Sequence, residues 1–549
     1  ACRCRRGRGA CAHCETAATH RRQLHKDVAA TIPAYFARAM SPAVARYPLS
    51  CASARLRRSH ELLSGADASS PARRDMAWRE ATLSVAAGGS GLTDWSEHAG
   101  AARCASVLRG WRKLQAISPI FAAQDIANPT LPILREVELE YNLLRDERDR
   151  IDKIYKGYDA TKHHTQRGGA ITRFHLKSLP PASAMPDLQR MFNDTKDKIP
   201  AQRTMSNVIY NSAHLKHLET TTAIDATNGE GVTTIPHRET NRFLSISQAH
   251  SGDWCTVRTD GSRATTPRSD QTRTAMARRH GLLLKDAVEV IDELRASDDP
   301  ALKKVGYEHD YLGDHLCNTD DRNGRHHEHN RAWHAAIAAV SLHTVLLGDK
   351  DKEAKSKSPL VSFNAGHVAD IVEPGGGPGG CDRLFEGKVV SPCVESPYQT
   401  GDMKGTKPPK IGHLYGFGNT EESYNIMILG NKRRGPLGTP FDPDTGEGHV
   451  EHRDGHYADA LKRGKKVIPL IAEVFGGLAP HAARFLRQLS RVAAKHTTRD
   501  STKYGRSARS FSEHHGQRIS HAIVMTDALN ICEGTTKLKK RLLMQSRAA

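Results

Sequence analysis

Apolar residues in roughly the first 300 positions recur mainly at the spacing of helix turns. The clearest segment is 281–296, whose apolar positions follow a period of 3.6 residues: Leu283, Leu284, Ala287, Val288, Val290, Ile291 and Leu294. Similar patterns predict helices within 52–115, 132–160 and 198–220, with a break at the glycines of 88–91. The first half of the chain is therefore expected to be mostly helical.

The second half changes to short apolar runs of the kind that form strands. His367–Val372 and Leu384–Val390 are two such runs, and the Gly/Pro-rich stretch 375–380 between them predicts a hairpin. A third run, Val467–Phe475, is ended by two glycines. These three strands are the only part of the chain where we expect a sheet.

Two helices, at 331–347 and 482–493, flank these strands, and a Gly/Pro-rich insertion at 395–455 separates the second strand from the third. The order helix, strand, strand, insertion, strand, helix predicts a small α/β core. The fold class expected is α+β and multidomain, with a mostly helical N-terminal half, this core, and C-terminal helices. The expected segments are a basic Cys/His leader (1–50), a helical region (51–255), a linker (256–325), the α/β core with its insertion (326–478), and basic C-terminal helices (479–549).

The charge balance of the chain points to an acidic partner. Lys plus Arg number 80 against 61 Asp plus Glu, which gives a formal net charge of +19 over 549 residues. Nucleic acid, whether DNA or RNA, is the first candidate for a polyanionic partner. The alternative is a basic scaffold protein without a specific ligand.

No run of about 18 apolar residues occurs, so we expect no membrane span. The first residues lack the apolar stretch of a secretory signal, and the 11 cysteines are spread out and odd in number, which suits reduced thiols. A nuclear or cytoplasmic location is therefore expected, and secretion is not. The N-terminal cysteines Cys2, Cys4, Cys11 and Cys14 lie among histidines and arginines, as zinc ligands or as part of a disordered basic leader.

The predicted hairpin carries a set of residues with chemical meaning. Glu386 and Lys388 are two positions apart, so their side chains project to one face of a strand, and Asp370 comes from the neighbouring run. Two carboxylates can hold Mg²⁺ for phosphodiester cleavage, with the lysine orienting or polarising the reacting groups. Catalytic roles are therefore predicted for all three residues, and Mg²⁺ ligation for the two acids. The alternative is an ordinary edge hairpin with solvated charges.

This D…ExK set resembles the motif of the PD-(D/E)xK nuclease superfamily, in which it lies on a restriction-endonuclease-like core. Other phrases resemble the region downstream of the polymerase palm in R2-type non-LTR retrotransposon polyproteins. They appear in family order: 77–92, with its Gly-Gly-Ser-Gly-Leu; 202–206; 243–254, which contains Ser-Gly-Asp-Trp; 310–330; and 468–477, which contains Ile-Pro-Leu-Ile-Ala-Glu-Val-Phe-Gly-Gly.

The resemblance implies a zinc knuckle at 310–330, followed by an endonuclease. His315 and Cys317 match the knuckle, and His326 and His329 are candidate replacements for the missing Cys pair; the alternative is an eroded turn without metal. The chain has no Tyr-x-Asp-Asp motif, so polymerase activity is not predicted and a separate reverse-transcriptase portion is a candidate partner. Ala369 stands where the family has proline before the first aspartate.

Further residues extend the predicted site. Glu328 is a candidate third Mg²⁺ ligand, or simply an acid that stabilises a helix N-terminus. Glu473 is another acid near a strand end, or a packing feature. Basic residues predicted to contact nucleic acid, if they are not just solvated charges, are Lys462, Lys465, Lys466, Lys539, Lys540 and Arg541.

Two functions follow from these patterns. The first is a retroelement-derived, Mg²⁺-dependent endonuclease that nicks DNA and lacks the polymerase palm. The second is a catalytically inactive remnant that still binds nucleic acid. The D…ExK set favours the first function, whereas the incomplete knuckle and the missing palm favour the second.

Overall fold

The structure is a computed structural model. It describes residues 37–123 apart from 84, 86 and 87, together with 130–160, 179–185, 202–227, 238–257, 267–318, 322–348, 362–363, 367–393, 428–431, 436–439, 453–496, 508–545 and the single residues 33 and 449. The chain divides into two compact units. Unit 1 comprises 1–62, 78–84 and 90–220, and unit 2 comprises 63–77, 85–89 and 221–549.

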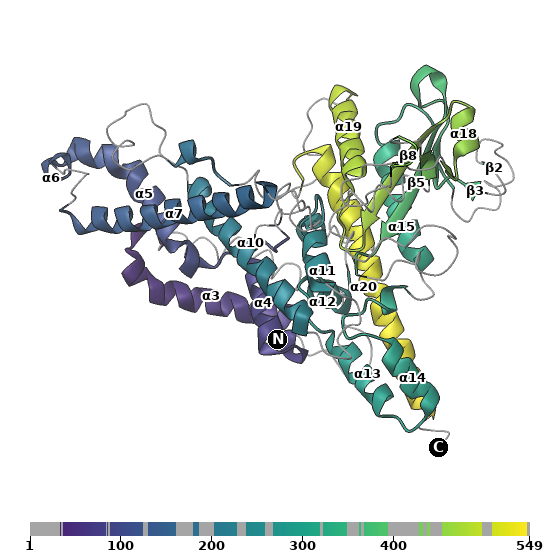
Figure 1. Ribbon diagram of the computed structural model, residues 1–549, viewed down its shortest axis with the longest axis horizontal. Coiled ribbons are helices and arrows are strands. Elements are labelled where there is room, and N and C mark those ends of the chain that lie inside the picture. Colours follow the sequence, from purple (N-terminus) through teal and green to yellow (C-terminus); the bar gives the residue numbers. More distant parts are fainter. Residues whose placement is uncertain are drawn as a thin grey trace, which may run out of the picture. The chain divides into compact units, whose positions relative to one another are not determined.

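Unit 1 is helical throughout its described part (Figure 1). Its helices are α3 (Pro42–Ser64) and α4 (Pro71–Thr82), which extend into unit 2, α5 (Trp95–Ile117), α6 (Pro119–Ala122), α7 (Pro132–Ala160), the short η3 (Ala182–Ala184) and α10 (Gln202–Thr227). A buried cluster joins α5 to α7, with Cys104 and Leu108 against Val137 and Tyr141. These residues recur three or four positions apart, so one stripe of each helix faces the other.

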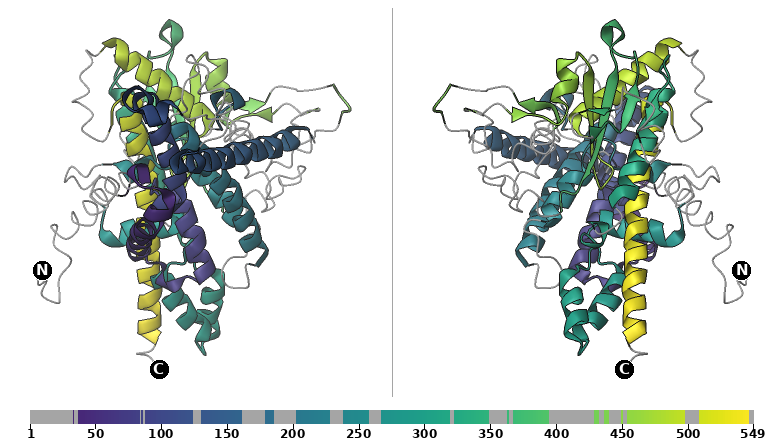
Figure 2. Two further views of the ribbon diagram at one scale, coloured as in Figure 1. Left: turned by 90° about the vertical axis from the view of Figure 1, so that its left-hand side faces the viewer. Right: turned by 90° about the vertical axis from the view of Figure 1, so that its right-hand side faces the viewer.

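Unit 2 begins with helices that pack around one long C-terminal helix. They are η1 (Ala66–Ala68), α11 (Arg238–Ile246), η4 (Asp253–Thr256), α12 (Ser269–Arg279), α13 (Lys285–Ala296), α14 (Pro300–Glu308), η5 (Leu316–Asn318) and α15 (Arg322–Ala338), followed after the sheet by α19 (Pro480–His496) and α20 (Phe511–Gln545). Helix α20 contacts α12, α13, α15 and α19, and Figure 2 shows it in yellow as one long helix. The predicted apolar stripe of 281–296 is the buried face of α13.

The sheet of unit 2 has four strands in the order β1-β4-β5-β8. Its strands are β1 (Leu346–Leu347), β4 (Ile371–Glu373), β5 (Arg383–Val390) and β8 (Lys466–Glu473). The first three are antiparallel neighbours, whereas β5 and β8 are parallel. Two shorter ladders pair β2 (Ser362–Phe363) with β3 (His367–Val368), and β6 (Gly430–Asn431) with β7 (Arg453–Asp454). Between β4 and β5 the chain turns through η6 (Pro378–Gly380).

Each face of the sheet has its own apolar cluster, because successive side chains of a strand point to opposite sides. Phe385 and Leu470 face α15 and α19, where Trp333 and Phe485 cover them. Leu384 belongs to a second cluster with residues that flank and form α18 (Ala458–Lys462). Figure 1 shows α19 on one side of β5 and β8 and α18 on the other.

The structure confirms the coarse α+β class, since it is mostly helical with one small mixed sheet. It also corrects three details of the sequence analysis. Pro42–Ser50, assigned to the leader, are helical and belong to α3, where Ala45 and Leu49 are buried. The expected linker 256–325 contains, besides the predicted helix that is α13, the helices α12 and α14, and all three share a buried apolar cluster, so the segment is part of the folded unit.

The third correction concerns the helix predicted at 331–347. It runs instead from Arg322 to Ala338, and Leu346 and Leu347 form β1. The first half of α15 lacks apolar residues, so the pattern missed it. A buried ion pair stabilises this half, since Arg325 donates to Asp527 of α20 at 2.7 Å.

Arg325 belongs to a buried network of charged residues in unit 2. Asp527 also pairs with Arg278 at 3.3 Å, and Arg278 pairs with Asp314 at 3.2 Å. Further pairs join Asp314 to Arg238 at 2.7 Å and Arg238 to Glu239 at 2.8 Å. Because each charge has an opposite partner inside the protein, burial does not leave an uncompensated ion.

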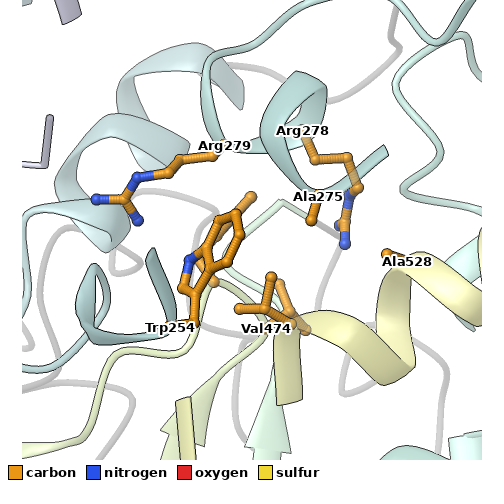
Figure 3. Close-up of a pocket in the computed structure, with 8 residues that line it drawn as sticks. Trp254, Ala275, Arg278, Arg279, Val474 and Ala528 are labelled. Carbon is orange, nitrogen blue, oxygen red and sulfur yellow. The ribbon is translucent and has the colours of Figure 1, made fainter. Parts of the chain in front are cut away.

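Two neighbouring arginines of α12 leave the helix in different directions (Figure 3). Arg278 lies over the ring of Phe475 at 5.3 Å, and Arg279 donates to the carbonyls of Gly88 and Ser251. With Trp254 these arginines line a small hollow. Both guanidinium groups serve packing within unit 2.

No helix among the described residues combines the length and apolar character that crossing a bilayer requires. Cys2, Cys4, Cys11 and Cys14 lie outside the described residues, as does most of the insertion 395–455. The described parts of the insertion include β6 and β7.

Candidate active site

Strand β5 places Glu386 and Lys388 on the same face of the sheet. The Lys388 ammonium nitrogen lies 2.6 Å from Glu386 Oε1. The Glu386 side chain is 8% exposed and that of Lys388 is 30% exposed, so the lysine reaches solvent while the carboxylate is nearly enclosed. The sequence placed this pair correctly because alternation along one strand depends only on local geometry.

Asp370 lies directly before β4, the neighbour of β5. Its Oδ2 accepts a hydrogen bond from the backbone amide of Gly387 at 2.7 Å. Gly387 separates Glu386 from Lys388 in sequence, so the backbone of the E-G-K segment itself holds the other carboxylate. The three predicted catalytic residues are thus gathered at one end of the β4–β5 pair.

Helix α15 approaches this segment closely. A Cβ added to Gly387 would lie 2.0 Å from Asn330 Oδ1 and 3.1 Å from His329 Nδ1. Real Cβ atoms essentially never come so near another atom, so a larger residue would displace the Asn330 and His329 side chains through which α15 packs here. Glycine at this position therefore sets the distance between the helix and the site.

Two side chains of α15, four residues apart, complete one side of the site. His326 Nε2 lies 3.0 Å from Asp370 Oδ1, and Asn330 Nδ2 lies 3.1 Å from His326 Nε2. Residues i and i+4 share a helix face, which lets both reach the end of β4. The ion pair between the adjacent Arg325 and Asp527 fixes the helix that carries them.

The other carboxylate has a partner from a distant part of the chain. Tyr457, just before α18, donates its hydroxyl to Glu386 Oε2 at 2.5 Å. Lys388 contacts the other oxygen of Glu386, so each oxygen has one neighbour. Tyr457 is buried in the apolar cluster beneath this face of the sheet, and a buried phenol hydroxyl generally finds such a partner.

The two carboxylates are electrostatically distinct. Burial raises the pKa of Asp370, but the hydrogen bond and charge of His326, the charge of Lys388 and the Gly387 amide outweigh it, so the pKa is lowered overall. Burial and the nearby charge of Asp370 raise the pKa of Glu386 despite Lys388 and Tyr457. Two close acids with opposite shifts are a recurrent mark of functional sites.

Two neighbouring groups remain uncharged. Burial and the Glu386 charge raise the pKa of Tyr457, so its hydroxyl stays a hydrogen-bond donor. Burial lowers the pKa of His329 to about 3, and Trp333 Nε1 donates to its Nε2 at 3.1 Å. His329 is therefore a neutral packing residue behind Gly387.

The donor set suits Mg²⁺ better than zinc. Mg²⁺ prefers oxygen ligands, keeps several waters and needs only one or two protein carboxylates, which Asp370 and Glu386 supply. Zinc usually takes four protein ligands in structural sites and three in catalytic ones. Within the ranges that the structure describes, no three His, Cys, Asp or Glu side chains are grouped so that they could hold a metal ion.

The structure does not bring the four predicted zinc ligands together. The His315 ring lies against that of His309, with centroids 4.6 Å apart, while His326 faces Asp370 and His329 faces Trp333. Cys317 is buried, and its burial raises the pKa of the thiol so that it stays protonated. In the knuckle-like phrase, Asp310 accepts from three backbone amides instead, those of Leu312, Asp314 and His315.

The two further acids considered for the site, Glu328 and Glu473, lie apart from Asp370 and Glu386. Glu328 forms an ion pair with Arg331 at 2.6 Å, and its helical position is about 160–200° from His326 and Asn330, on the other side of α15. Glu473, at the end of β8, accepts a hydrogen bond from Ser245 of α11. Complete burial raises the pKa of Glu473 to about 8, so it is mostly protonated near neutral pH.

Most of the lysines predicted to bind nucleic acid have acidic neighbours. Lys465 pairs with Asp382 at 3.0 Å, and Lys462 and Lys539 lie 3.9 Å from Asp454 and Asp286. The remaining predicted cations are exposed at the start of β8 or near the end of α20: Lys466, Lys540 and Arg541.

Sequence reasoning missed Tyr457 and Asn330, and it gave His326 a different role. Tyr457 lies 71 residues after Glu386, beyond the insertion, and no local pattern connects the two. His326 and Asn330 are four residues apart in a histidine-rich stretch that resembled a zinc site. Their spacing would have placed both on one helix face, but only once the helix start was known.

Comparisons with protein-family models, with curated proteins and with solved structures find no match to this chain.

Proposed function

We propose that unit 2 is a metal-dependent endonuclease that nicks DNA at the site formed by Asp370, Glu386 and Lys388. The observation that carries the proposal is the meeting of these three side chains at one end of the β4–β5 pair. The pKa of Asp370 is lowered and that of Glu386 is raised. The site reaches solvent through the partly exposed side chain of Lys388. Solvated charges on an edge hairpin need neither the buried partners nor these shifts.

The chain's own residues prepare the site for a cation. His326 and the Gly387 amide orient Asp370, and Tyr457 orients Glu386. When bound between the carboxylates, Mg²⁺ would supply charge stabilisation and a more acidic water. Lys388 adds a positive charge on the solvent side, where a scissile phosphate can approach.

A restriction-endonuclease-like core is part of this proposal. The order α15, β1, β4, β5, β8, α19 supports it, because a mixed sheet with helices before and after it carries Glu386 on the central strand β5 and Asp370 directly before the neighbouring strand β4. The R2-like phrases support a retroelement origin. In that setting a nick exposes a 3′ hydroxyl, and a separate reverse-transcriptase portion would extend it.

One observation favours a second candidate, a nucleic-acid-binding remnant without activity. Both oxygens of Glu386 already have protein partners, and the side chain is nearly buried. If Lys388 and Tyr457 hold this carboxylate permanently, no cation can reach it, and the site is only a buried polar cluster.

Conversion of supercoiled plasmid to open circles separates the two functions. The endonuclease predicts nicking by the wild-type protein with Mg²⁺, none with a chelator, and none by Asp370→Asn or Glu386→Gln. Glu533→Gln, which removes an exposed carboxylate of α20, is the matched control and should nick normally. Saturable plasmid binding without nicking under every condition would assign the remnant function instead.

A further inference from the structure

Helix α19 has two sharply different faces. One face is buried in the core of unit 2 and consists of Ala482, Ala483, Phe485, Leu486, Leu489 and Ala493. The opposite face carries exposed Arg484, Arg487, Arg491 and Lys495. At about 100° per residue these four cations lie within roughly 80° of one another, so they form one row along the helix. We call this row the α19 basic stripe.

Among the described residues, no acidic side chain neutralises the basic stripe. Pro480–His496 contains no aspartate or glutamate, and none of the four cations has an ion pair within the part of the chain that the structure describes. Three exposed cations elsewhere in unit 2 do have such partners, Arg268 with Asp270, Lys285 with Asp67, and Lys304 with Glu308, whereas Lys540 and Arg541 are exposed without one among the described residues. Four cations in one row repel one another when no acid lies among them. Binding of an external anion would relieve this repulsion.

We propose that the α19 basic stripe binds the phosphate backbone of duplex DNA. From Arg484 to Lys495 the helix rises about 16 Å at 1.5 Å per residue. At about 3.4 Å per phosphate of one strand, this length covers roughly five phosphates. One further cation, Lys466, lies near this face: burial lowers the pKa of His481 most, and the charges of Arg484 and then Lys466 lower it further, so both cations are close to that imidazole.

The stripe has no free apolar face with which to insert into a bilayer. A helix that binds a bilayer inserts its apolar face among the lipid chains. The apolar face of α19 is already packed, with Phe485 against Trp333 and Phe385 at ring separations of 6.1 and 5.5 Å. Only the charged face is available, and charge alone suits a densely charged polymer.

The inference rests on the part of the proposed function that makes nucleic acid the ligand, and not on cleavage. Helix α19 follows β8 directly, and β8 pairs with β5, where Pro469 lies beside Glu386 and Ile471 beside Lys388. The stripe and the candidate active site therefore belong to one sheet-and-helix core (Figure 1). DNA held along the stripe would be bound by the same core that carries the carboxylates.

The test compares two triple variants of equal charge change. In the stripe variant, Arg484, Arg487 and Arg491 are replaced by Gln; in the control variant, Arg268, Lys285 and Lys304 are replaced by Gln. Binding of a fluorescent DNA duplex is measured in a chelator, so cleavage cannot contribute, at several salt concentrations. Circular dichroism checks that both variants stay folded, which is expected because all six side chains are exposed.

We expect the stripe variant to bind about tenfold more weakly or worse, and the control variant to bind nearly as the wild type does. The slope of log affinity against log salt should fall by about one for each lost phosphate contact, roughly three in total. Equal losses in both variants would show that only net charge matters and would overturn the proposal. Tighter, stripe-dependent binding of polyglutamate than of DNA would also overturn it, in favour of an acidic protein partner.

The same variants distinguish this inference from the endonuclease proposal. If the wild-type protein binds DNA through the stripe but never nicks it, the stripe stands and the catalytic proposal fails. In the opposite case, the wild-type protein nicks DNA, and the stripe variant binds and nicks DNA as well as the control variant does. The catalytic proposal then stands, and the proposal that the α19 basic stripe binds DNA is rejected.

Discussion

The backbone amide of Gly387 donates a hydrogen bond to Asp370 at 2.7 Å. Through this bond the segment that carries Glu386 and Lys388 also fixes the position of the second carboxylate. The same glycine leaves room for α15, which brings His326 to the other oxygen of Asp370. Gly387 is thus the point where strand, helix and both acids meet.

Gly387→Ala should damage both stability and the site. Its new Cβ would lie 2.0 Å from Asn330 Oδ1, so the Asn330 side chain, and with it the packing of α15 on β5, must shift. Overpacking of this kind costs about 1–3 kcal/mol of unfolding free energy, which urea denaturation can measure. Nicking should fall as well, because His326 moves with α15.

Gly110→Ala is the control for this substitution. A Cβ at Gly110 of α5 meets no atom within 4 Å, and alanine favours helix, so the variant should be unchanged or about 1 kcal/mol more stable. A Gly387→Ala protein as stable and active as the wild type would show that α15 does not position the site.

Asp527→Asn should be strongly destabilising. The carboxylate lies between Arg325 at 2.7 Å and Arg278 at 3.3 Å, and all three side chains are buried. Removing one partner from a buried ion pair typically costs about 3–5 kcal/mol, because it leaves an uncompensated charge. Glu533→Gln, on the exposed side of the same helix, should change the unfolding free energy by less than about 0.5 kcal/mol. If Asp527→Asn lowered the unfolding free energy by no more than this, Asp527 would not be what holds α15 and its Arg325 against α20.

Glu473→Gln should alter how stability depends on pH. Burial raises the pKa of Glu473 to about 8, above the ordinary value of 4.5. Its protonated form therefore contributes stability that is fully present below pH 4.5 and is lost as the pH rises through about 8. Urea denaturation at pH 5 and pH 9 should show wild-type stability falling by on the order of a few kcal/mol relative to Glu473→Gln. Parallel pH profiles would mean that Glu473 titrates normally.

Lys388→Met should raise the pH below which cation binding weakens, which we call the acid limb of the binding curve. The cation requires both carboxylates ionised, and the raised pKa of Glu386 makes this residue the last to lose its proton as pH rises. Lys388 lowers the pKa of Glu386, so its removal raises that pKa further. Lys388→Arg keeps the charge and should leave the limb near its wild-type position. The measurement is Mn²⁺ affinity against pH, and identical limbs in the Met and Arg variants would count against this coupling.

The sequence predicted the parts of the site that depend on local geometry. The apolar runs and the glycine turn predicted the β4–β5 hairpin, whose pairing brings Asp370 near Glu386 and Lys388. The run His367–Val372, predicted as one strand, is instead divided between β3 and β4, which belong to different sheets. The sequence did not predict the start of α15, because Arg325 gains its stabilising partner 202 residues away in α20. It also gave no sign of Tyr457, which reaches Glu386 only after the chain has returned from the insertion.

The histidines of 325–330 show the same limit of sequence patterns. Their resemblance to a zinc-knuckle phrase left two interpretations open, zinc ligands or an eroded turn without metal. The fold sends the side chains of this segment in different directions around α15, to Asp527, Asp370 and Trp333. Composition can indicate that such residues have buried partners, but only the tertiary structure determines which partners they are.

The most direct test of the site is a Mn²⁺ titration of the wild-type protein, Asp370→Asn and Glu386→Gln, followed by calorimetry at neutral pH. We predict that the wild-type protein binds an ion that each substitution weakens by at least about tenfold, since each removes one of two charged ligands. Equal Mn²⁺ affinity in all three proteins would contradict a cation site between Asp370 and Glu386.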